Sequence, residues 1–233
     1  MVADREDRIT RRQFVVSLSA GALAILASGC LPRAPLAPPG FPTAAELAKS
    51  EIRVYQGQRL DSITASIENS IKGPQYVDKA TWSLLVDGLV DRTAVYTFAQ
   101  LVGNFPANKQ VHRLDCVEGW GETQLWEGVR ILDVLDASGV EPAATTVILH
   151  AHDGYTTSFP VDYFTKEHLL VHRINAVDLA PERGAPLRLG AWSKWGYKWI
   201  RWIERIELSD DTEYRGYWES RGYSNDAERD RTP

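Results

Sequence analysis

The chain has 233 residues, of which 44% are hydrophobic and eight are Trp, enough to bury the core of one large domain or two small ones. This composition excludes intrinsic disorder as the general state of the chain. The 26 Lys and Arg residues are outnumbered by 31 Asp and Glu residues, and the resulting net charge of −5 argues against nucleic acid as a partner.

The first 29 residues have the pattern of an export signal. Arg11 and Arg12 stand directly before an apolar run, residues 15–27. This run is shorter than the roughly 20 apolar residues that a membrane-spanning helix needs, and small residues follow it. The paired arginines resemble a twin-arginine signal, which predicts that the protein folds and takes up any cofactor before export.

The end of this signal resembles the lipobox of bacterial lipoproteins, Leu26-Ala27-Ser28-Gly29-Cys30. In that interpretation Cys30 is lipidated and contacts the membrane; the alternative is a plain signal peptide with an accidental cysteine. Residues 30–49 are rich in Pro and predict a semi-rigid linker. The protein is expected in the periplasm or cell envelope.

The only other cysteine, Cys116, would then have no intramolecular partner. An unpaired cysteine in an exported protein suggests a reactive or metal-ligating thiol. The alternative is a buried cysteine that acts as a small apolar residue. Cysteine count alone leaves both open.

Hydrophobic periodicity along residues 50–226 predicts several short strands and two helices. A capped helix is expected after Thr97, and a second helix over 130–137 with Gly139 as its stop. Strands are expected near 82–86, 111–117, 145–152, 155–159, 169–174 and 202–208, with a tight turn at Asp153-Gly154. The predicted fold class is α+β with dominant β structure.

Several motifs resemble the sulfite oxidase family of molybdopterin-dependent oxidoreductases. The cysteine motif is Asp115-Cys116-Val117-Glu118-Gly119-Trp120. Other blocks follow in the family's order: Asn69–Gln75, Trp126–Val129, His152–Tyr155, Glu182–Arg188, Gly196–Trp202 and Gly216–Tyr223. The resemblance covers roughly residues 50–226, taken as the catalytic domain, with 227–233 as a tail. It implies a β-rich molybdopterin-binding domain.

The resemblance also implies roles for particular residues. Cys116 would bind molybdenum, for which a soft thiolate is a suitable ligand. Arg188, Lys198 and Arg201 would contact the phosphate of molybdopterin, although surface charge is the usual fate of such residues. Asn69 would lie near the metal or pterin, or else be a turn residue. Trp120 would line the substrate mouth.

Two positions depart from the pattern of sulfite oxidases proper. Ile71 is apolar where they carry a basic or His residue, and Arg183 replaces a His. Both departures argue against sulfite itself as substrate. The chain is more similar to the smaller bacterial members, such as periplasmic methionine-sulfoxide reductase catalytic subunits.

The resemblance therefore predicts two-electron chemistry, with oxygen-atom transfer on a small sulfoxide, N-oxide or sulfite-like substrate. The chain carries no haem or iron–sulfur motif, so electrons are expected to pass to or from a separate cytochrome or membrane haem protein. One alternative is a non-catalytic lipoprotein that keeps the fold. Another is a zinc site built from Cys116, His112, His150 or His152.

Overall fold

The computed structural model describes residues 37–165 and 167–229. The chain divides into two units, residues 1–36 and 37–233, and the second holds all of the described residues. The predicted signal peptide, the lipidation site Cys30 and the end of the predicted tail lie outside them. No helix within the described ranges is long and apolar enough to cross a bilayer.

Strands dominate the described part of the chain. The helices are α2 (Ala44–Leu47), α3 (Phe98–Asn104) and α4 (Ile131–Ser138), with 3₁₀ turns η1 (Val161–Tyr163), η2 (Pro181–Arg183), η3 (Gly196–Lys198) and η4 (Glu219–Arg221). The strands are β1 (Val54–Tyr55), β2 (Gln58–Arg59), β3 (Ser83–Gly88), β4 (Ala94–Thr97), β5 (Ala107–Asp115), β6 (Gly121–Arg130), β7 (Thr146–Ala151), β8 (Thr156–Pro160), β9 (Leu169–Ile174), β10 (Val177–Asp178), β11 (Arg188–Gly190) and β12 (Ile203–Ser209). The predicted β-rich α+β class is confirmed.

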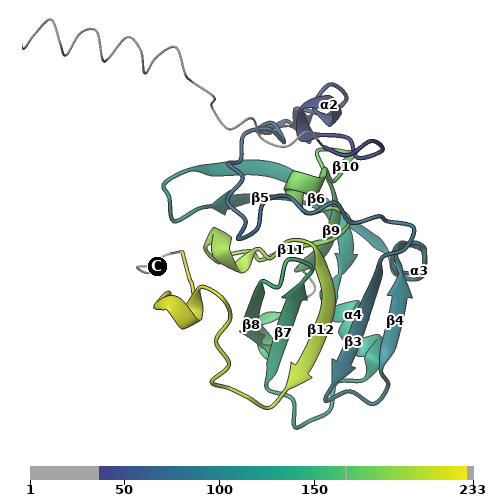
Figure 1. Cartoon of the computed structure of the whole chain (residues 1–233), viewed down its shortest axis with the longest axis vertical. Coiled ribbons are helices and arrows are strands. Elements are labelled where there is room, and N and C mark those ends of the chain that lie inside the picture. The colour runs from purple at the N-terminus through teal and green to yellow at the C-terminus, as the bar shows by residue number, and fades with distance from the viewer. Residues whose placement is uncertain (1–36, 166, 230–233) are drawn as a thin grey trace, which may run out of the picture. The chain divides into compact units, whose positions relative to one another are not determined.

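One sheet has the strand order β4-β3-β12-β7-β8, and these strands run side by side in the lower half of Figure 1. All of its pairs are antiparallel except β3 with β12. β12 is the last strand among the described residues, and it inserts between two strands that precede it in sequence. The C-terminal residues thereby become central to the sheet.

The other large sheet has the order β10-β9-β6-β5, with β11 also paired to β9. Its longest pairing joins β5 to β6 over residues 107–115 and 121–129. The hairpin connection between these two strands contains Cys116. The register of the β5–β6 pair therefore determines where the cysteine lies.

A single hydrophobic cluster draws side chains from both sheets and from helix α4. Leu84 and Val86 of β3 are fully buried, as is Trp126 of β6. Alternation of buried and half-buried positions along β3 reflects the two-residue period of a strand. The cluster supplies a rigid support beneath the loops at the ends of the strands.

Local sequence signals explain both longer helices. Thr97 accepts a hydrogen bond from the backbone of Gln100, whose side chain binds back to Thr97, so the two form a capping box at the start of α3. Gly139 ends α4 in a left-handed conformation with φ of 69°, which glycine adopts without strain. Both predicted helices and their end signals are confirmed.

The longest strand, β6, is not foreseen by the sequence pattern. Its consecutive residues from Gln124 to Val129 are all buried, because other parts of the chain cover both of its faces. A strand buried on both faces has no alternating pattern to detect. Glu122 and Glu127 are also buried, and acidic residues are not expected in a buried strand, so they make β6 harder to predict from the sequence.

Part of the predicted linker, residues 30–49, belongs to the folded unit. Helix α2 begins after Thr43, which forms a capping box with Glu46. The backbone N–H of Ala44 donates to the Glu182 carboxylate at 2.6 Å, and the Ala44 side chain is buried. This contact attaches the segment before residue 50 to turn η2.

Candidate active site

A cavity of about 170 Å³ lies where loops from both sheets meet. Its walls come from the loop after β2, the β5–β6 turn, the β7–β8 turn, turns η2 and η3, and the C-terminal segment. The lining residues are Ser66, Ile67, Asn69–Ile71, Leu114, Cys116–Glu118, Trp120, Glu122, Asp153, Tyr155, Arg183, Arg188, Gly196, Tyr197, Trp199–Trp202, Trp218 and Tyr223. Cys116, Trp120, Asn69, Arg188 and Arg201 of the sequence-predicted site are among them.

A tight turn presents Cys116 to the cavity. The N–H of Cys116 donates to the carbonyl of Trp120, and the N–H of Gly119 donates to the carbonyl of Cys116. Gly119 has a φ of 88°, a left-handed conformation that favours glycine. Gly196 approaches the turn closely, because a Cβ there would lie 3.2 Å from the Asp115 carbonyl oxygen.

Polar groups surround the thiol of Cys116. Its sulfur lies 3.7 Å from the Asn69 amide nitrogen and 3.6 Å from the Glu118 carboxylate. The Trp120 indole N–H donates to the same carboxylate at 2.8 Å. Burial raises the pKa of the Cys116 thiol, and the negative charge of Glu118 acts in the same direction.

Three arginines concentrate positive charge in the cavity wall. Arg201 donates to the Glu68 carboxylate at 2.7 Å and to the side-chain oxygen of Asn69. Arg183 donates to the Ser66 carbonyl. Arg188 lies over the ring of Trp126 and donates to the Arg183 carbonyl at 3.3 Å.

Two of these guanidinium groups, those of Arg183 and Arg188, are buried and have a nitrogen without a hydrogen-bond partner. Arg188 is 4% exposed, and burial, followed by the charge of Arg201, lowers its pKa to about 9. Burial also lowers the pKa of Arg183. The Nε atoms of Arg183 and Arg188 and the hydroxyl of Ser70 are buried without a hydrogen-bond partner. Positively charged residues with unpaired donors in the wall of a cavity suit an anionic ligand.

Sequence reasoning missed several wall residues. Glu122 is almost fully buried; burial raises the pKa of its carboxyl, and the nearby Arg183 and Arg188 charges oppose that shift. In the sequence Arg183 stands out only as a departure from the sulfite oxidase pattern, although it shares a sequence block with Arg188. Tyr197 and Tyr223 also lie in recognised blocks, but no pattern indicated that they face the cavity.

The structure does not bring Lys198 to the cavity. Its side chain is fully buried and forms an ion pair with Glu219 at 2.6 Å. Its ammonium group also donates to the Ser158 carbonyl and to Asn225. The sequence resemblance paired Lys198 with Arg201, but turn η3 and the following loop direct the two side chains to different surroundings.

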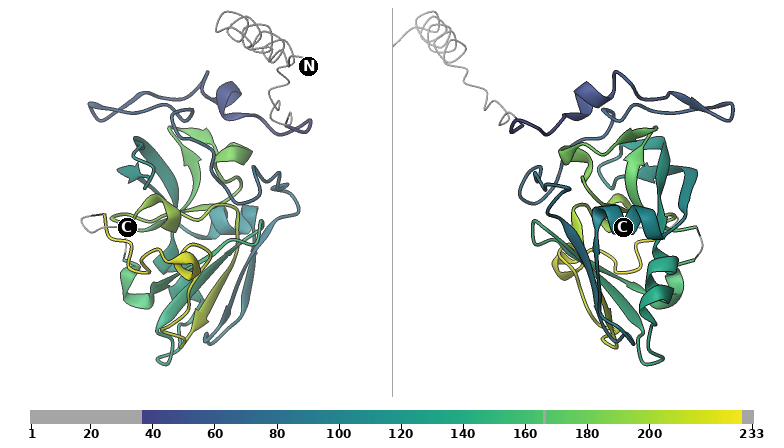
Figure 2. Two further views of the ribbon diagram at one scale, coloured as in Figure 1. Left: turned by 60° about the vertical axis from the view of Figure 1, so that its left-hand side comes forward. Right: turned by 90° about the vertical axis from the view of Figure 1, so that its right-hand side faces the viewer.

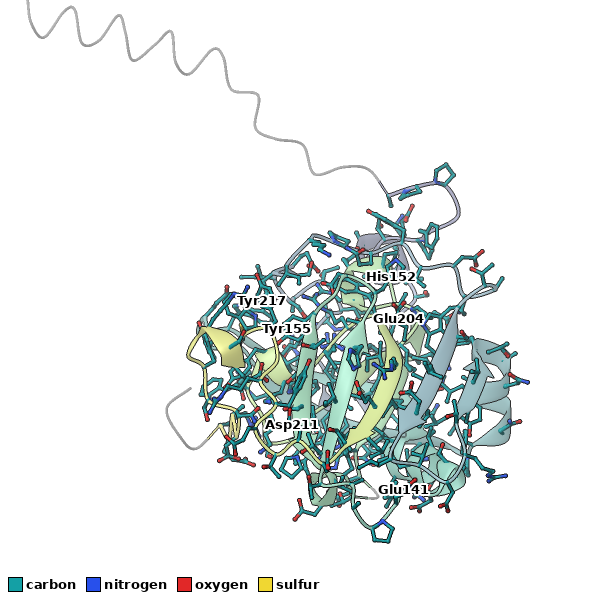
Figure 3. All side chains as sticks on the ribbon, turned by 60° about the horizontal axis from the view of Figure 1, so that its bottom comes forward. Glu141, His152, Tyr155, Glu204, Asp211 and Tyr217 are labelled. Carbon is teal, nitrogen blue, oxygen red and sulfur yellow. The ribbon has the colours of Figure 1, made fainter. Side chains whose placement is uncertain are left out.

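The described histidines have other neighbours than Cys116. His150 lies 2.8 Å from Glu207, and His152 lies 3.0 Å from Glu204, on strands β7 and β12 or just after them. Figure 3 shows His152 and Glu204 side by side. His112 stacks on Trp192 with ring centroids 4.0 Å apart. None of these histidines lines the cavity, so the zinc alternative gains no support from this geometry.

Comparisons with known proteins agree with this site. Residues 71–218 match the model of the oxidoreductase molybdopterin-binding domain. The chain is 37% identical over 152 residues to the uncharacterized oxidoreductase YuiH of Bacillus subtilis (strain 168). The match covers 64% of this chain and 76% of that protein.

One further relative and one solved structure match only part of their own length. The chain is 29% identical over 147 residues to the protein-methionine-sulfoxide reductase catalytic subunit MsrP of Gluconobacter oxydans (strain 621H), over 55% of this chain and 47% of that subunit. The sulfane dehydrogenase SoxCD of Paracoccus pantotrophus shares the fold, with a TM-score of 0.58 at 20% identity over 81% of this chain and 59% of that one. With its family domain matched over most of its folded length, the chain belongs to the molybdopterin-binding oxidoreductases of the sulfite oxidase family.

Proposed function

We propose that this oxidoreductase transfers an oxygen atom from a small S-oxide or N-oxide, with Cys116 as the protein ligand of molybdenum. The observation that carries the proposal is the cavity that joins the Cys116 thiol to three arginines. The name of the Gluconobacter relative, a methionine-sulfoxide reductase, supports reduction as the direction. The match covers about half of that subunit.

The donor groups of the cavity fit molybdopterin. The cofactor carries a phosphate, and the guanidinium groups of Arg183 and Arg188, which line the cavity, can offer charge-assisted hydrogen bonds to such a group. The Ser70 hydroxyl provides a further donor. A single thiolate next to these donors matches the need of the metal for a soft ligand.

Each residue then has a separate task. Arg183 and Arg188 bind the phosphate. Arg201, which is held by Glu68, orients the Asn69 amide toward Cys116. When bound, the molybdenum–pterin group would supply the two-electron redox change.

The proposed overall reaction needs an electron donor. The sulfur–oxygen or nitrogen–oxygen bond of the substrate breaks, and its oxygen leaves as water with two protons from solvent and two electrons. A one-electron carrier, a cytochrome or a membrane haem protein, delivers these electrons in two steps. The products are a sulfide or an amine.

The proposed place of action is the cell envelope. The paired Arg11 and Arg12 and the lipobox-like sequence ending at Cys30 support twin-arginine export and lipid anchoring. Residues 31–36, rich in Pro, would then separate the anchor from the folded unit. Labelling with a radioactive fatty acid tests this: wild-type protein should incorporate label, and Cys30→Ala should not.

The decisive experiment measures molybdenum and pterin in protein purified from cells that synthesise the cofactor. We expect near one of each per chain, together with reduction of methyl sulfoxides by reduced viologen dye. Loaded protein that reduces neither sulfoxides nor N-oxides would contradict the proposed reaction. A well-folded protein without either component would favour the non-catalytic lipoprotein.

Arg188 provides a second test with a matched control. Arg188→Gln removes a buried charge from the phosphate site, and we expect retained cofactor after gel filtration to fall by about tenfold or more. Arg205→Gln removes a charge from the outer face of the sheet, where Arg205 pairs with Asp87 and Glu207. This control should keep full cofactor content, and equal loss in both variants would contradict the assigned role.

A further inference from the structure

The C-terminal segment, residues 211–229, forms a strap that runs back from β12 along the edge of β8, as the yellow ribbon in Figures 1 and 2 shows. The N–H of Tyr217 donates to the Thr156 carbonyl at 2.9 Å. A Cβ at Gly216 would lie 2.2 Å from that carbonyl oxygen, so only glycine permits this approach. This C-terminal strap continues past residue 218, where the family match ends.

Charged contacts attach the C-terminal strap to the domain. Glu219 forms its buried ion pair with Lys198 and accepts a hydrogen bond from Thr157. Glu228 pairs with Lys194 at 2.5 Å. Near the end, Arg229 pairs at 2.7 Å with Asp115, the residue before the proposed metal ligand. The strap is therefore a fixed wall of the site.

The C-terminal strap places an aromatic cluster at the cavity. Trp218 and Tyr223 both line it, with ring centroids 5.3 Å apart. Tyr223 also contacts Tyr197, whose hydroxyl donates to the Ser224 carbonyl. Tyr155 and Tyr217 lie next to one another beside these rings, with centroids 5.7 Å apart (Figure 3).

The charges near this aromatic cluster do not favour an anion. The cationic side chains that line the cavity are Arg183, Arg188 and Arg201, within the described residues. The first two are assigned to the cofactor phosphate, and Arg201 is already neutralised by Glu68 at 2.7 Å. Beside Cys116 lies the carboxylate of Glu118, which repels anions.

We infer that the C-terminal strap is the substrate-recognition wall, and that Trp218, Tyr223 and Tyr197 select a neutral organic S-oxide or N-oxide over an inorganic oxyanion. The inference rests on the proposed function for the chemistry of the substrate. Aromatic faces bind apolar substituents and polarisable sulfur, whereas an oxyanion needs fixed donors and positive charge.

The test uses the molybdenum-loaded protein and two probes that do not react. Methyl phenyl sulfone represents the organic class and sulfate the inorganic class, and calorimetry measures the affinity of each. Wild-type protein should bind the sulfone and show at least tenfold weaker binding of sulfate. Preference for sulfate would overturn the inference.

Substitutions that remove an aromatic ring test whether the C-terminal strap binds the sulfone. Trp218→Ala and Tyr223→Ala should each weaken sulfone binding by about tenfold, with molybdenum content unchanged. Tyr223→Phe keeps the ring and should bind nearly as the wild type does. Tyr55→Ala, on β1 and away from the cavity lining, is the control and should have no effect. Unchanged sulfone affinity in both ring-deleted variants would overturn the inference, and Trp218→Leu, which also removes the ring but fills more space, replaces Trp218→Ala if the latter does not fold.

Kinetics separate this inference from the proposed function. With methyl phenyl sulfoxide as substrate, the ring variants should raise KM by about tenfold and change kcat by less than about threefold. Chlorate, an inorganic oxygen donor, should be used poorly by every variant. If the sulfone binds through these rings but no sulfoxide is reduced, the inference about the C-terminal strap stands and the proposed reaction is wrong. If sulfoxides are reduced with identical KM in all variants, the proposed reaction stands and the inference about the C-terminal strap is wrong.

Discussion

Cys116 lies in a turn whose hydrogen bonds are made by its backbone N–H and carbonyl. Its sulfur contacts polar side chains of Asn69 and Glu118. A serine at this position keeps the turn and replaces the soft thiolate with a hard hydroxyl. The residue's contribution to metal binding is thus separable from its contribution to the fold.

We predict that Cys116→Ser lowers molybdenum content to below about one tenth of the wild-type value, because a hydroxyl is a poor ligand for a metal that prefers thiolate. Circular dichroism and the unfolding midpoint of the cofactor-free protein should change little. Elemental analysis after gel filtration provides the measurement. Full molybdenum occupancy in this variant would remove Cys116 from the proposed metal site.

His168 is a residue whose protonation affects stability rather than chemistry. It is 7% exposed, and its Nδ1 accepts a hydrogen bond from the Thr165 N–H. Burial, with smaller contributions from the charges of His112 and Lys194, lowers its pKa from 6.5 to about 4. In the folded protein the imidazole of His168 therefore remains neutral over a pH range in which the same side chain of the unfolded chain binds a proton.

This difference predicts a loss of stability in acid. Between pH 6.5 and pH 4 the unfolded state binds more protons than the folded state, so the free energy of unfolding falls as the pH falls, by about 2–3 kcal/mol from this residue. His168→Asn keeps an acceptor for Thr165 and does not titrate there. Urea unfolding at pH 7.5 and pH 4.5 should show a smaller pH effect in this variant; an equal effect would contradict the prediction.

At the scale of elements, the pairing of β6 with β9 depends on a close backbone contact. A Cβ at Gly128 would lie 2.1 Å from the carbonyl oxygen of Leu170, and the register of the two strands shifts beside this glycine. The strands can approach one another only because no side chain intervenes. Gly128 thereby fixes the position of β9, on which β11 and Arg188 depend.

We predict that Gly128→Ala lowers the free energy of unfolding by about 2–4 kcal/mol, because the added methyl group forces the strands apart. Gly103→Ala is the matched control, since a Cβ there meets no atom within 4 Å in helix α3. Alanine favours the helix, so the control should be neutral or stabilised by about 0.5–1 kcal/mol. Chemical denaturation measures both; equal effects would show that the contact is unimportant.

The two elements that carry the arginines are brought together in a similar way. Arg188 begins β11 and forms an isolated bridge with Arg201, which precedes β12. Their charges repel, and the Glu68 and Glu122 carboxylates partly compensate. A negative charge bound in the cavity would offset the remaining repulsion.

At the scale of the whole folded unit, the Lys198–Glu219 ion pair joins the C-terminal strap to turn η3, and Lys198 also donates to the Ser158 carbonyl of β8. Both side chains are fully buried. Charges so deeply buried are costly unless they are paired. Burial lowers the pKa of Lys198, and the charge of Glu219 opposes that shift.

We predict that Glu219→Gln costs about 3–5 kcal/mol of unfolding free energy, because the ammonium of Lys198 loses its counter-charge. The double variant Lys198→Met/Glu219→Gln removes both charges and should recover most of this loss. Asp178→Asn, which breaks the exposed pair with Lys79, should cost less than about 1 kcal/mol. A double variant no more stable than Glu219→Gln would contradict this explanation.

The sequence by itself determined the parts of this protein that depend on local signals. The capping box at Thr97, the glycine stop at Gly139 and the strand over 169–174 follow from residues close in the chain. The same holds for the family motif around Cys116, which is continuous in sequence. These features need no distant contact to be recognised.

Tertiary structure alone decided which side chains meet at the cavity. Lys198 and Arg201 are three positions apart, yet one pairs with Glu219 and the other with Glu68. Strand β6 was hidden because burial on both faces removes the alternation that identifies a strand. Trp218 and Tyr223 reach the site because β12 and the C-terminal strap return the end of the chain to the cavity. Their roles depend on contacts between segments far apart in the sequence, and no short-range pattern encodes such contacts.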